Sequence, residues 1–341
     1  LDGLLMAAAW GALVGGFLQF GIQLPWVLRL NREMRINTGR GEPAFREAVR
    51  NAGPAIMGRG VVQLSSYVDM VLASLLAIGA LARLRYAQTL YILPISLFGM
   101  SVAAAELPEL ARQRGSAAEA LRERTVAALR RVAFFVAPSL LAFLLLGDVI
   151  VAGIFREGAF GAADVSIVWL TLAAYSLGLL ASTSTRVYQS AFFALRDTKT
   201  PARVAGLRVL AAALGGAVLM VQFEPVALGG FTLPAGFFGD VRVAGLPLGP
   251  VGLALGAAIG AWLEWAMLRR TLGQRIGSIG IGGSHLARMF IAALAAAAAS
   301  HATRIAMPTL HPLLTAAIVM GVFALVYLAL ACALRLEEAQ V

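Results

Sequence analysis

Ionisable side chains stand inside long apolar stretches of this 341-residue chain, where they are energetically costly. A charged group in a hydrocarbon environment normally faces a polar interior, a partner or a transport pathway. The residues concerned are Arg59, Asp69, Arg186, Arg208 and Glu264. Arginine stays charged, and its guanidinium fork matches phosphate oxygens, so these cations suit the binding of an anion. The pattern therefore predicts a membrane protein with a polar interior, which favours transport.

Two of the apolar stretches carry polar residues at helical spacing. Ser182, Arg186 and Gln189 follow one another at i, i+4 and i+7, which places them on one face of a helix. Arg59 and Gln63 repeat the first step of that spacing in an earlier stretch. We expect both polar stripes to bind substrate.

Arg208 adds a third cation, about two turns beyond the proline at the start of its stretch. Two or three arginines that face one cavity would bind phosphate well. Asp69 and Glu264 are expected to couple to these charges and to balance them when no anion is bound. The alternatives are that each arginine only pairs with an acidic residue, or that Arg59 snorkels to the headgroups.

Residue patterns of enzymes are missing from the sequence. His285, His301 and His311 are too scattered for a metal site, and Cys332 is the only cysteine. The glycine-rich segment 273–283 lacks the strand and the Lys-Ser/Thr pair of a phosphate-binding loop. We therefore expect a protein that is not an enzyme, with no catalytic residue, metal or cofactor.

The elements that must position these residues are nine apolar stretches, each close to the 20 or so residues that cross a bilayer as a helix. Composition agrees, with 60% hydrophobic residues, 13% charged residues and a mean hydropathy of +0.81. The sequence predicts an all-α, polytopic membrane bundle of about nine transmembrane helices. The stretches are 4–28, 53–76, 86–105, 132–154, 165–193, 204–221, 251–268, 290–302 with its flanks, and 313–334.

Basic residues are distributed unequally between the loops. If the nine spans alternate in direction, 20 of the 28 basic residues lie on one side and 5 on the other. The positive-inside rule makes the richer side cytoplasmic, so the chain starts outside and its C-terminus is cytoplasmic. This sorting accounts for the net charge of +10, and we expect no nucleic-acid partner. The external loop 223–250 is predicted to form a small hairpin.

Several segments, in order along the whole chain, resemble the MurJ (MviN) family of lipid II flippases in the MOP exporter superfamily. They are GGFLQFGIQLP in the first stretch, GPAIMGRGVVQLSSYVDMVLAS at 53–74, YAQTLYILPISLFGMSVAAAELPELAR at 86–112, IFREGAF at 154–160 and YSLGLLASTSTRVYQSAFFALRDTKTP at 175–201. The resemblance implies two six-helix lobes around a central cavity, followed by two further helices.

The same resemblance implies a function. Family members export the undecaprenyl-diphosphate-linked peptidoglycan precursor, lipid II, across the bacterial inner membrane by alternating access, and a cationic cavity binds the headgroup. Arg186 matches a position that can be basic in the family, whereas Thr89 stands where many members have arginine, and we expect both residues to bind substrate. Asp69 aligns with an aspartate of a sodium site, but the other two ligands of that site fall on Ala212 and Gly216, so sodium coupling is doubtful.

The resemblance also divides the chain into parts. Residues 1–30 are expected to be the last helix of an otherwise missing N-terminal lobe, and 31–52 a cytoplasmic linker. Residues 53–270 would form the C-terminal six-helix lobe, and 271–341 two additional transmembrane helices. The expected partners are lipid II or a similar polyprenyl-diphosphate lipid, the bilayer and proteins of cell-wall synthesis. The alternatives are a related exporter of another polyprenyl-linked oligosaccharide or of a drug, and an inactive flippase-like scaffold.

The charge distribution generates a topology prediction. Single cysteines that replace Thr38 and Gly280, in a chain whose Cys332 is changed to alanine, should react with a membrane-impermeant maleimide only from the cytoplasmic face. Phe237→Cys in the loop 223–250 is the control and should react from outside. Labelling of position 38 or 280 in intact cells would contradict the predicted topology.

Overall fold

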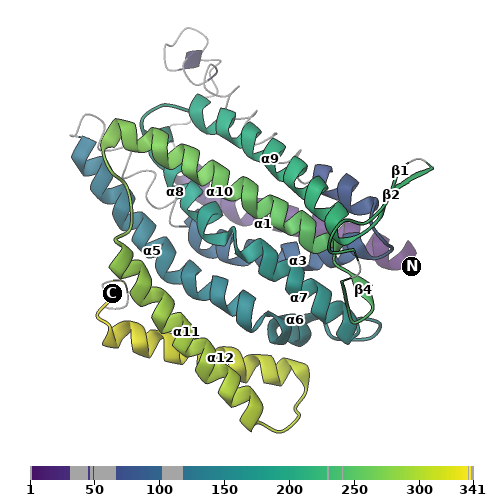
Figure 1. Cartoon of the computed structure of the whole chain (residues 1–341). Coiled ribbons are helices and arrows are strands. Elements are labelled where there is room, and N and C mark those ends of the chain that lie inside the picture. Colours follow the sequence, from purple (N-terminus) through teal and green to yellow (C-terminus); the bar gives the residue numbers. More distant parts are fainter. Residues whose placement is uncertain are drawn as a thin grey trace. The chain divides into compact units, whose positions relative to one another are not determined.

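The computed structural model describes residues 2–30, 45–46, 49, 67–101, 118–228, 230–239, 241–336 and 338 (Figure 1). The chain forms two compact units, Leu1–Arg50 and Asn51–Val341. The predicted substrate residues Arg59 and Gln63 lie outside the described residues.

The first unit contains one long helix, α1 (Asp2–Leu30). Its segment Ala9–Leu30 is long and apolar enough to cross a membrane. Large apolar side chains such as Trp10, Phe17 and Trp26 are exposed on it. A helix with an apolar surface of this kind fits a lipid environment or a helical partner.

The second unit is a helical bundle with two short hairpins, which confirms the predicted all-α membrane class (Figure 1). Residues 67–74 are helical and precede the first labelled element of the unit. The elements are α3 (Ala80–Pro94), η1 (Ile95–Met100), α5 (Ala118–Leu145), α6 (Gly147–Phe155), α7 (Ala162–Ser176), α8 (Leu179–Ala194), α9 (Lys199–Phe223), β1 (Val226–Leu228), β2 (Phe231–Leu233), β3 (Arg242–Val243), β4 (Leu246–Pro247), α10 (Gly249–Ile276), α11 (Gly283–Ala306) and α12 (Pro312–Ala333).

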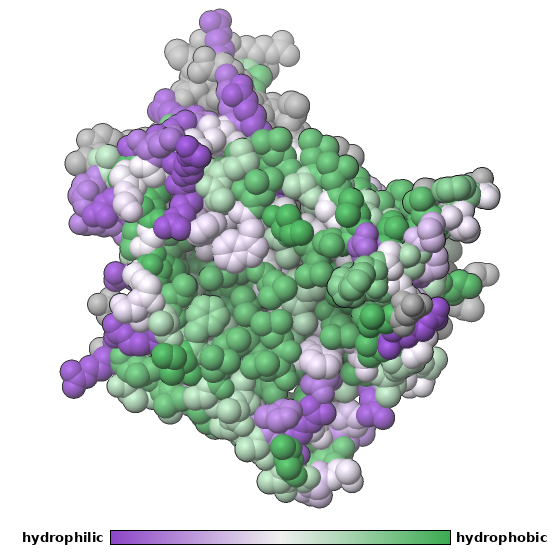
Figure 2. All heavy atoms as spheres, in the orientation of Figure 1, coloured by the Kyte–Doolittle hydropathy of each residue, from purple (hydrophilic) through white to green (hydrophobic). Residues whose placement is uncertain are grey.

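Six helices in the described part of the chain are long and apolar enough to span a membrane, and the pair α7 and α8, bent by 43°, passes as one broken span. The predicted stretch 132–154 is divided at Leu146 into α5 and α6. The stretches 53–76 and 86–105 lie partly outside the described residues, so the count of nine stays a prediction. Figure 2 shows a broad apolar face with hydrophilic residues gathered mainly at its margins, as expected for a surface in contact with lipid.

The loop between α9 and α10 has the hairpin character that the sequence predicts. Strand β1 pairs antiparallel with β2, with Val226 opposite Leu233. Strand β3 pairs antiparallel with β4, with Arg242 opposite Pro247. The loop therefore holds two short hairpins rather than a domain.

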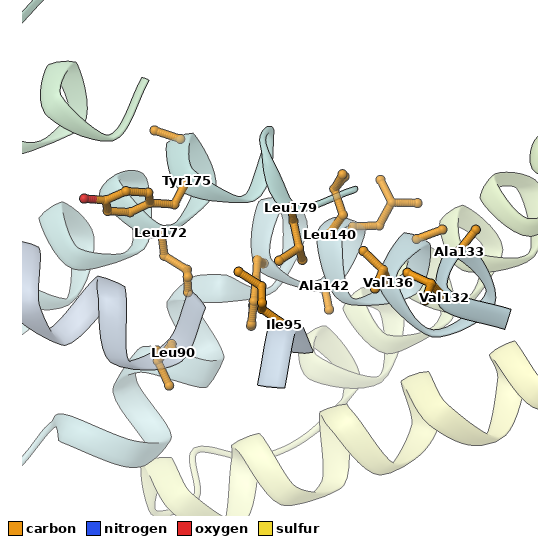
Figure 3. Packing of buried hydrophobic residues seen from close by; sticks show 14 of the residues in the cluster. Leu90, Ile95, Val132, Ala133, Val136, Leu140, Ala142, Leu172, Tyr175 and Leu179 are labelled. Carbon is orange, nitrogen blue, oxygen red and sulfur yellow. The ribbon is translucent and has the colours of Figure 1, made fainter. Parts of the chain in front are cut away.

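Apolar side chains from α3, α5, α7 and α8 pack together in the hydrophobic core (Figure 3). Leu90, Leu140, Leu172 and Leu179 are each less than one-tenth exposed. The C-terminal pair packs on this bundle, because α11 contacts α5 and α12 contacts α6. The hydroxyl of Tyr327 on α12 donates a hydrogen bond to a backbone carbonyl of α5 at 2.6 Å.

Helices α9 and α10 approach each other at backbone distance. Gly252, Gly256 and Gly260 recur at every fourth position of α10 and form one face. A Cβ at Gly256 would overlap the backbone of Gly216, and one at Gly260 would lie 2.8 Å from the carbonyl oxygen of Arg208. Small residues at such spacing let membrane helices pack closely. The glycine face therefore fixes α9 against α10.

The two ends of this helix pair are attached to neighbouring segments. At one end Glu224, which is 3% exposed, accepts a hydrogen bond from the amide of Ala77 in the turn before α3. At the other end Asp197, between α8 and α9, accepts the amide and hydroxyl of Thr200 at 2.9 and 2.6 Å. Arg275 of α10 donates to the same carboxylate at 2.7 Å. These contacts set the relative positions of α3, α8, α9 and α10.

Asp197 generates a prediction about pH. Partial burial acts to raise the pKa of the Asp197 carboxyl, but hydrogen bonds from Thr200 and Arg275 outweigh it and hold the pKa below its usual value. A lowered folded pKa contributes stability above the unfolded pKa of about 3.9, and this is lost as pH falls through the folded pKa. Asp197→Asn should therefore lower the thermal unfolding midpoint at pH 7, with a difference that shrinks below about pH 4.

The measurement is thermal unfolding of the purified chain in a non-ionic detergent between pH 3 and pH 7. Glu157→Gln, an exposed change in the loop between α6 and α7, is the control and should match the wild type. A deficit of Asp197→Asn that stays constant down to pH 3 would contradict the role of the charged carboxylate.

Candidate anion-binding site

The centre of the site is the carboxylate of Glu264, which is 1% exposed on α10. One of its oxygens accepts a hydrogen bond from the Arg208 guanidinium at 2.7 Å, and the other accepts from the side-chain amide of Gln189 at 3.1 Å. A charge taken out of water is costly unless it is paired and hydrogen-bonded. Both partners are therefore needed to hold this carboxylate inside the bundle.

The glycine face explains why the ion pair forms. Glu264 follows Gly260 by one helical turn and lies on the same face of α10. The close approach of the two backbones at Gly260 brings Arg208 of α9 beside that turn. The sequence left open whether Arg208 binds substrate or pairs with an acidic residue. The structure shows the pair with Glu264, with the Arg208 side chain 21% exposed.

The predicted stripe of α8 faces the same centre. Arg186 donates to the side-chain oxygen of Gln189 at 3.4 Å, so the amide of Gln189 connects Arg186 with Glu264. Ser182, at the start of the stripe, shares a 2.8 Å hydrogen bond with the hydroxyl of Tyr91 on α3. Residues from α3, α8, α9 and α10 thus meet in one polar cluster.

Two tyrosines in this cluster were missed by the sequence analysis. Tyr91 stacks on Tyr175 of α7 with ring centroids 5.1 Å apart. The hydroxyl of Tyr175 accepts a 2.9 Å hydrogen bond from the side chain of Gln88. Gln88 and Tyr91 lie three residues apart in an apolar stretch, and this spacing was the available signal.

Asp69 and Thr89 occupy different positions relative to the cluster. Asp69 is partly buried and interacts electrostatically with Arg208 and Arg85, and its role in charge coupling stays a prediction. Thr89 is exposed, and its hydroxyl donates to the carbonyl of Arg85 in its own helix at 2.9 Å. The hydrogen-bonded cluster therefore does not include Thr89, whose role in substrate binding stays a prediction.

The chemistry of the cluster is that of an anion site. Arg186 and Arg208 supply permanent cations, while Ser182, Tyr91 and Gln189 supply neutral hydrogen-bonding groups around them. No group of three or more His, Cys, Asp or Glu side chains suited to a metal occurs among the residues that the structure describes. Cations and neutral hydrogen-bonding groups of these types suit an anion, and the substrate-binding role of these residues stays a prediction.

Comparisons with known proteins give one family. The family model described as lipid II flippase MurJ matches residues 2–330. A "Probable lipid II flippase MurJ" of Vibrio cholerae is 29% identical over 293 residues, which cover 85% of this chain and 50% of that protein. One of Rhizobium tropici is 30% identical over 279 residues, which cover 81% and 50%.

A solved structure has the same fold. It is that of a lipid II flippase MurJ in an inward closed conformation, with a TM-score of 0.63 and 23% identity, and the match covers 82% of this chain and 52% of the other. The chain therefore spans about half the length of the relatives that it matches.

The buried ion pair generates a prediction about stability. Arg208→Met leaves the Glu264 carboxylate without its cation, and breaking a buried pair from one side typically costs about 3–5 kcal/mol, so the unfolding midpoint should fall strongly. The double variant Arg208→Met/Glu264→Leu removes both charges and should recover most of the loss. Thermal or denaturant unfolding of the purified variants forms a double-mutant cycle with Glu264→Leu. Additive losses would contradict a coupled pair.

Proposed function

The chain belongs to the lipid II flippase MurJ family, and on that basis we propose that its polar cluster binds the diphosphate headgroup of lipid II while the lipid is moved across the bacterial inner membrane. Six apolar helices and the family make the chain a multi-pass inner-membrane protein. The observation that carries the proposal is the chain of hydrogen bonds inside an apolar bundle that links Arg186 to Arg208 through Gln189 and Glu264.

Charge compensation supports this assignment. A diphosphate carries several negative charges and loses much of its hydration when it enters a bundle, so it needs fixed cations. Arg208 is already compensated by Glu264 when no substrate is present, which keeps the empty site stable. A bound diphosphate competes with Glu264 for the guanidinium groups. The site can therefore bind an anion, and Glu264 compensates the charge of Arg208 when no anion is bound.

Asp69 has a related role in the proposal. It lies in the field of Arg208 and Arg85, from a helix that is separate in sequence from α8, α9 and α10. From this position the Asp69 carboxylate affects the net charge of the site, both empty and with substrate bound. It does not contact the anion directly. We therefore propose that Asp69 and Glu264 couple charge, while Arg186, Arg208, Ser182 and Gln189 contact the headgroup.

Further elements of the proposal rest on the sequence. The distribution of basic residues favours a cytoplasmic C-terminus. Contact with proteins of cell-wall synthesis would place the flippase beside the reactions that make and use lipid II. Transport, in contrast to catalysis, needs no nucleophile or general base at the cluster.

Arg186 is the test residue. In the gene product that contains these 341 residues, Arg186→Ala should abolish growth of a flippase-depleted bacterium at near-normal membrane levels of the protein. Arg186→Lys should retain part of the function, because lysine keeps the charge but loses the bidentate fork. Asp69→Asn should impair turnover more than binding of a polyprenyl diphosphate. Growth and immunoblotted membrane protein are measured together.

Arg304→Ala is the matched control, because Arg304 pairs with Asp148 at 2.6 Å, outside the cluster. It removes the same charge and should support growth. Normal growth with Arg186→Ala would show that Arg186 is a packing residue and would refute the proposed headgroup site.

A further inference from the structure

The backbone carbonyl of Leu177 lies at the break between α7 and α8, beside the proposed anion site. Helices α7 and α8 meet at Leu177 and Gly178 with a bend of 43°, near the middle of the predicted span 165–193. Backbone groups at membrane depth must find partners within the protein, because lipid offers no hydrogen bonds. The carbonyl of Leu177 therefore needs a donor from elsewhere.

Trp262 of α10 supplies that donor. Its indole N–H donates to the carbonyl oxygen of Leu177 at 2.8 Å. Gly178 lies directly against α10, since a Cβ there would be 2.9 Å from the Cα of Ala258. Ala258 and Trp262 lie one turn apart on the same face. Close packing at Gly178 and the hydrogen bond from Trp262 therefore hold the break between α7 and α8 against α10.

The same arrangement recurs at the other break in the bundle. Between α5 and α6, the indole N–H of Trp169 donates to the carbonyl of Leu144 at 3.3 Å. A Cβ at Gly147, the first residue of α6, would collide with the ring of Trp169. Two helix breaks are therefore each paired with an adjacent glycine and a tryptophan from another helix. A tryptophan indole N–H commonly donates to a nearby acceptor of this kind.

The bend at Leu177 determines the direction of the stripe that forms the anion site. The amide of Ser182 donates to the carbonyl of Gly178 at 2.9 Å, so the first turn of α8 starts from the break. Further along α8, Gln189 contacts Glu264, which is on the same helix as Trp262. Helix α8 is thus attached to α10 at the break and again at the polar centre, and Arg186 lies between the two attachments.

We propose that Trp262 is a positioning residue for the anion site: its indole N–H fixes the bend at Leu177–Gly178 and so aims the Ser182–Arg186–Gln189 stripe at the Glu264–Arg208 pair. This inference rests on the proposed function, since it names a residue that acts on the same site without contacting the anion. Trp262 is not part of the polar cluster, and the residue is 41% exposed.

The first experiment measures the break directly. Trp262→Phe keeps an aromatic ring but removes the N–H, and hydrogen–deuterium exchange is followed by mass spectrometry on the purified chain in nanodiscs. Amides of residues 178–182 should exchange about three- to tenfold faster, as expected from the loss of one hydrogen bond. Amides of α9 should keep their rates. Trp10→Phe, a change on the exposed face of α1, is the matched control.

A second variant covers the case in which Trp262→Phe does not fold. Benzothienylalanine at position 262 keeps the shape of the two-ring side chain and replaces the N–H by sulfur. It should produce the same local increase in exchange. Unchanged exchange at residues 178–182 in a folded variant would overturn the inference.

The second experiment measures binding of farnesyl diphosphate, a short polyprenyl diphosphate, to the same nanodisc samples. Trp262→Phe should bind several-fold more weakly at an unfolding midpoint equal to that of Trp10→Phe, a combination that a purely structural role would not give. Equal affinity of Trp262→Phe and wild type would overturn the positioning role. Absence of binding by the wild type would instead refute the proposed function, and the exchange data alone then decide whether Trp262 holds the break.

Discussion

The arrangement of the second unit depends on one buried carboxylate. Glu264 is 1% exposed inside an apolar bundle, and Arg208 and Gln189 each donate a hydrogen bond to one of its two oxygens. Arg208 lies on α9 and Gln189 on α8. The bonds to one acidic residue on α10 therefore depend on the relative positions of all three helices. Arg186 joins the same network through Gln189. Arg186, Gln189, Glu264 and Arg208 therefore form one connected chain of hydrogen bonds.

Close backbone packing makes this set possible. Side chains larger than hydrogen on the α10 face at Gly252, Gly256 and Gly260 would separate α10 from α9 and carry Glu264 away from Arg208. The membrane supplies little hydrophobic drive between helices, so small residues and polar contacts must hold them together. The tryptophan bonds at the two helix breaks serve the complementary purpose. They give the carbonyls of Leu144 and Leu177 hydrogen-bond donors at the bends, where an apolar environment offers none.

Some features of the fold and of the site could be predicted from the sequence, and the physical reason differs between features. The spacing of Ser182, Arg186 and Gln189 predicts a shared helix face, because helical periodicity is a local property. Apolar length predicts spans such as α9 and α12 for the same reason. The breaks at Leu146 and at Leu177 were not predicted, because no proline marks either position and each lies within one long apolar stretch.

The sequence by itself determined the all-helical membrane class, the family, and the presence of charges that need partners, because composition, span length and local spacing do not depend on distant contacts. Only the tertiary structure decided which partners they take. Arg208 and Glu264 are 56 residues apart, and Gln189 and Glu264 are 75 apart. Such pairings follow from how closely α9 and α10 approach, and that approach depends on packing between segments that lie far apart in the sequence.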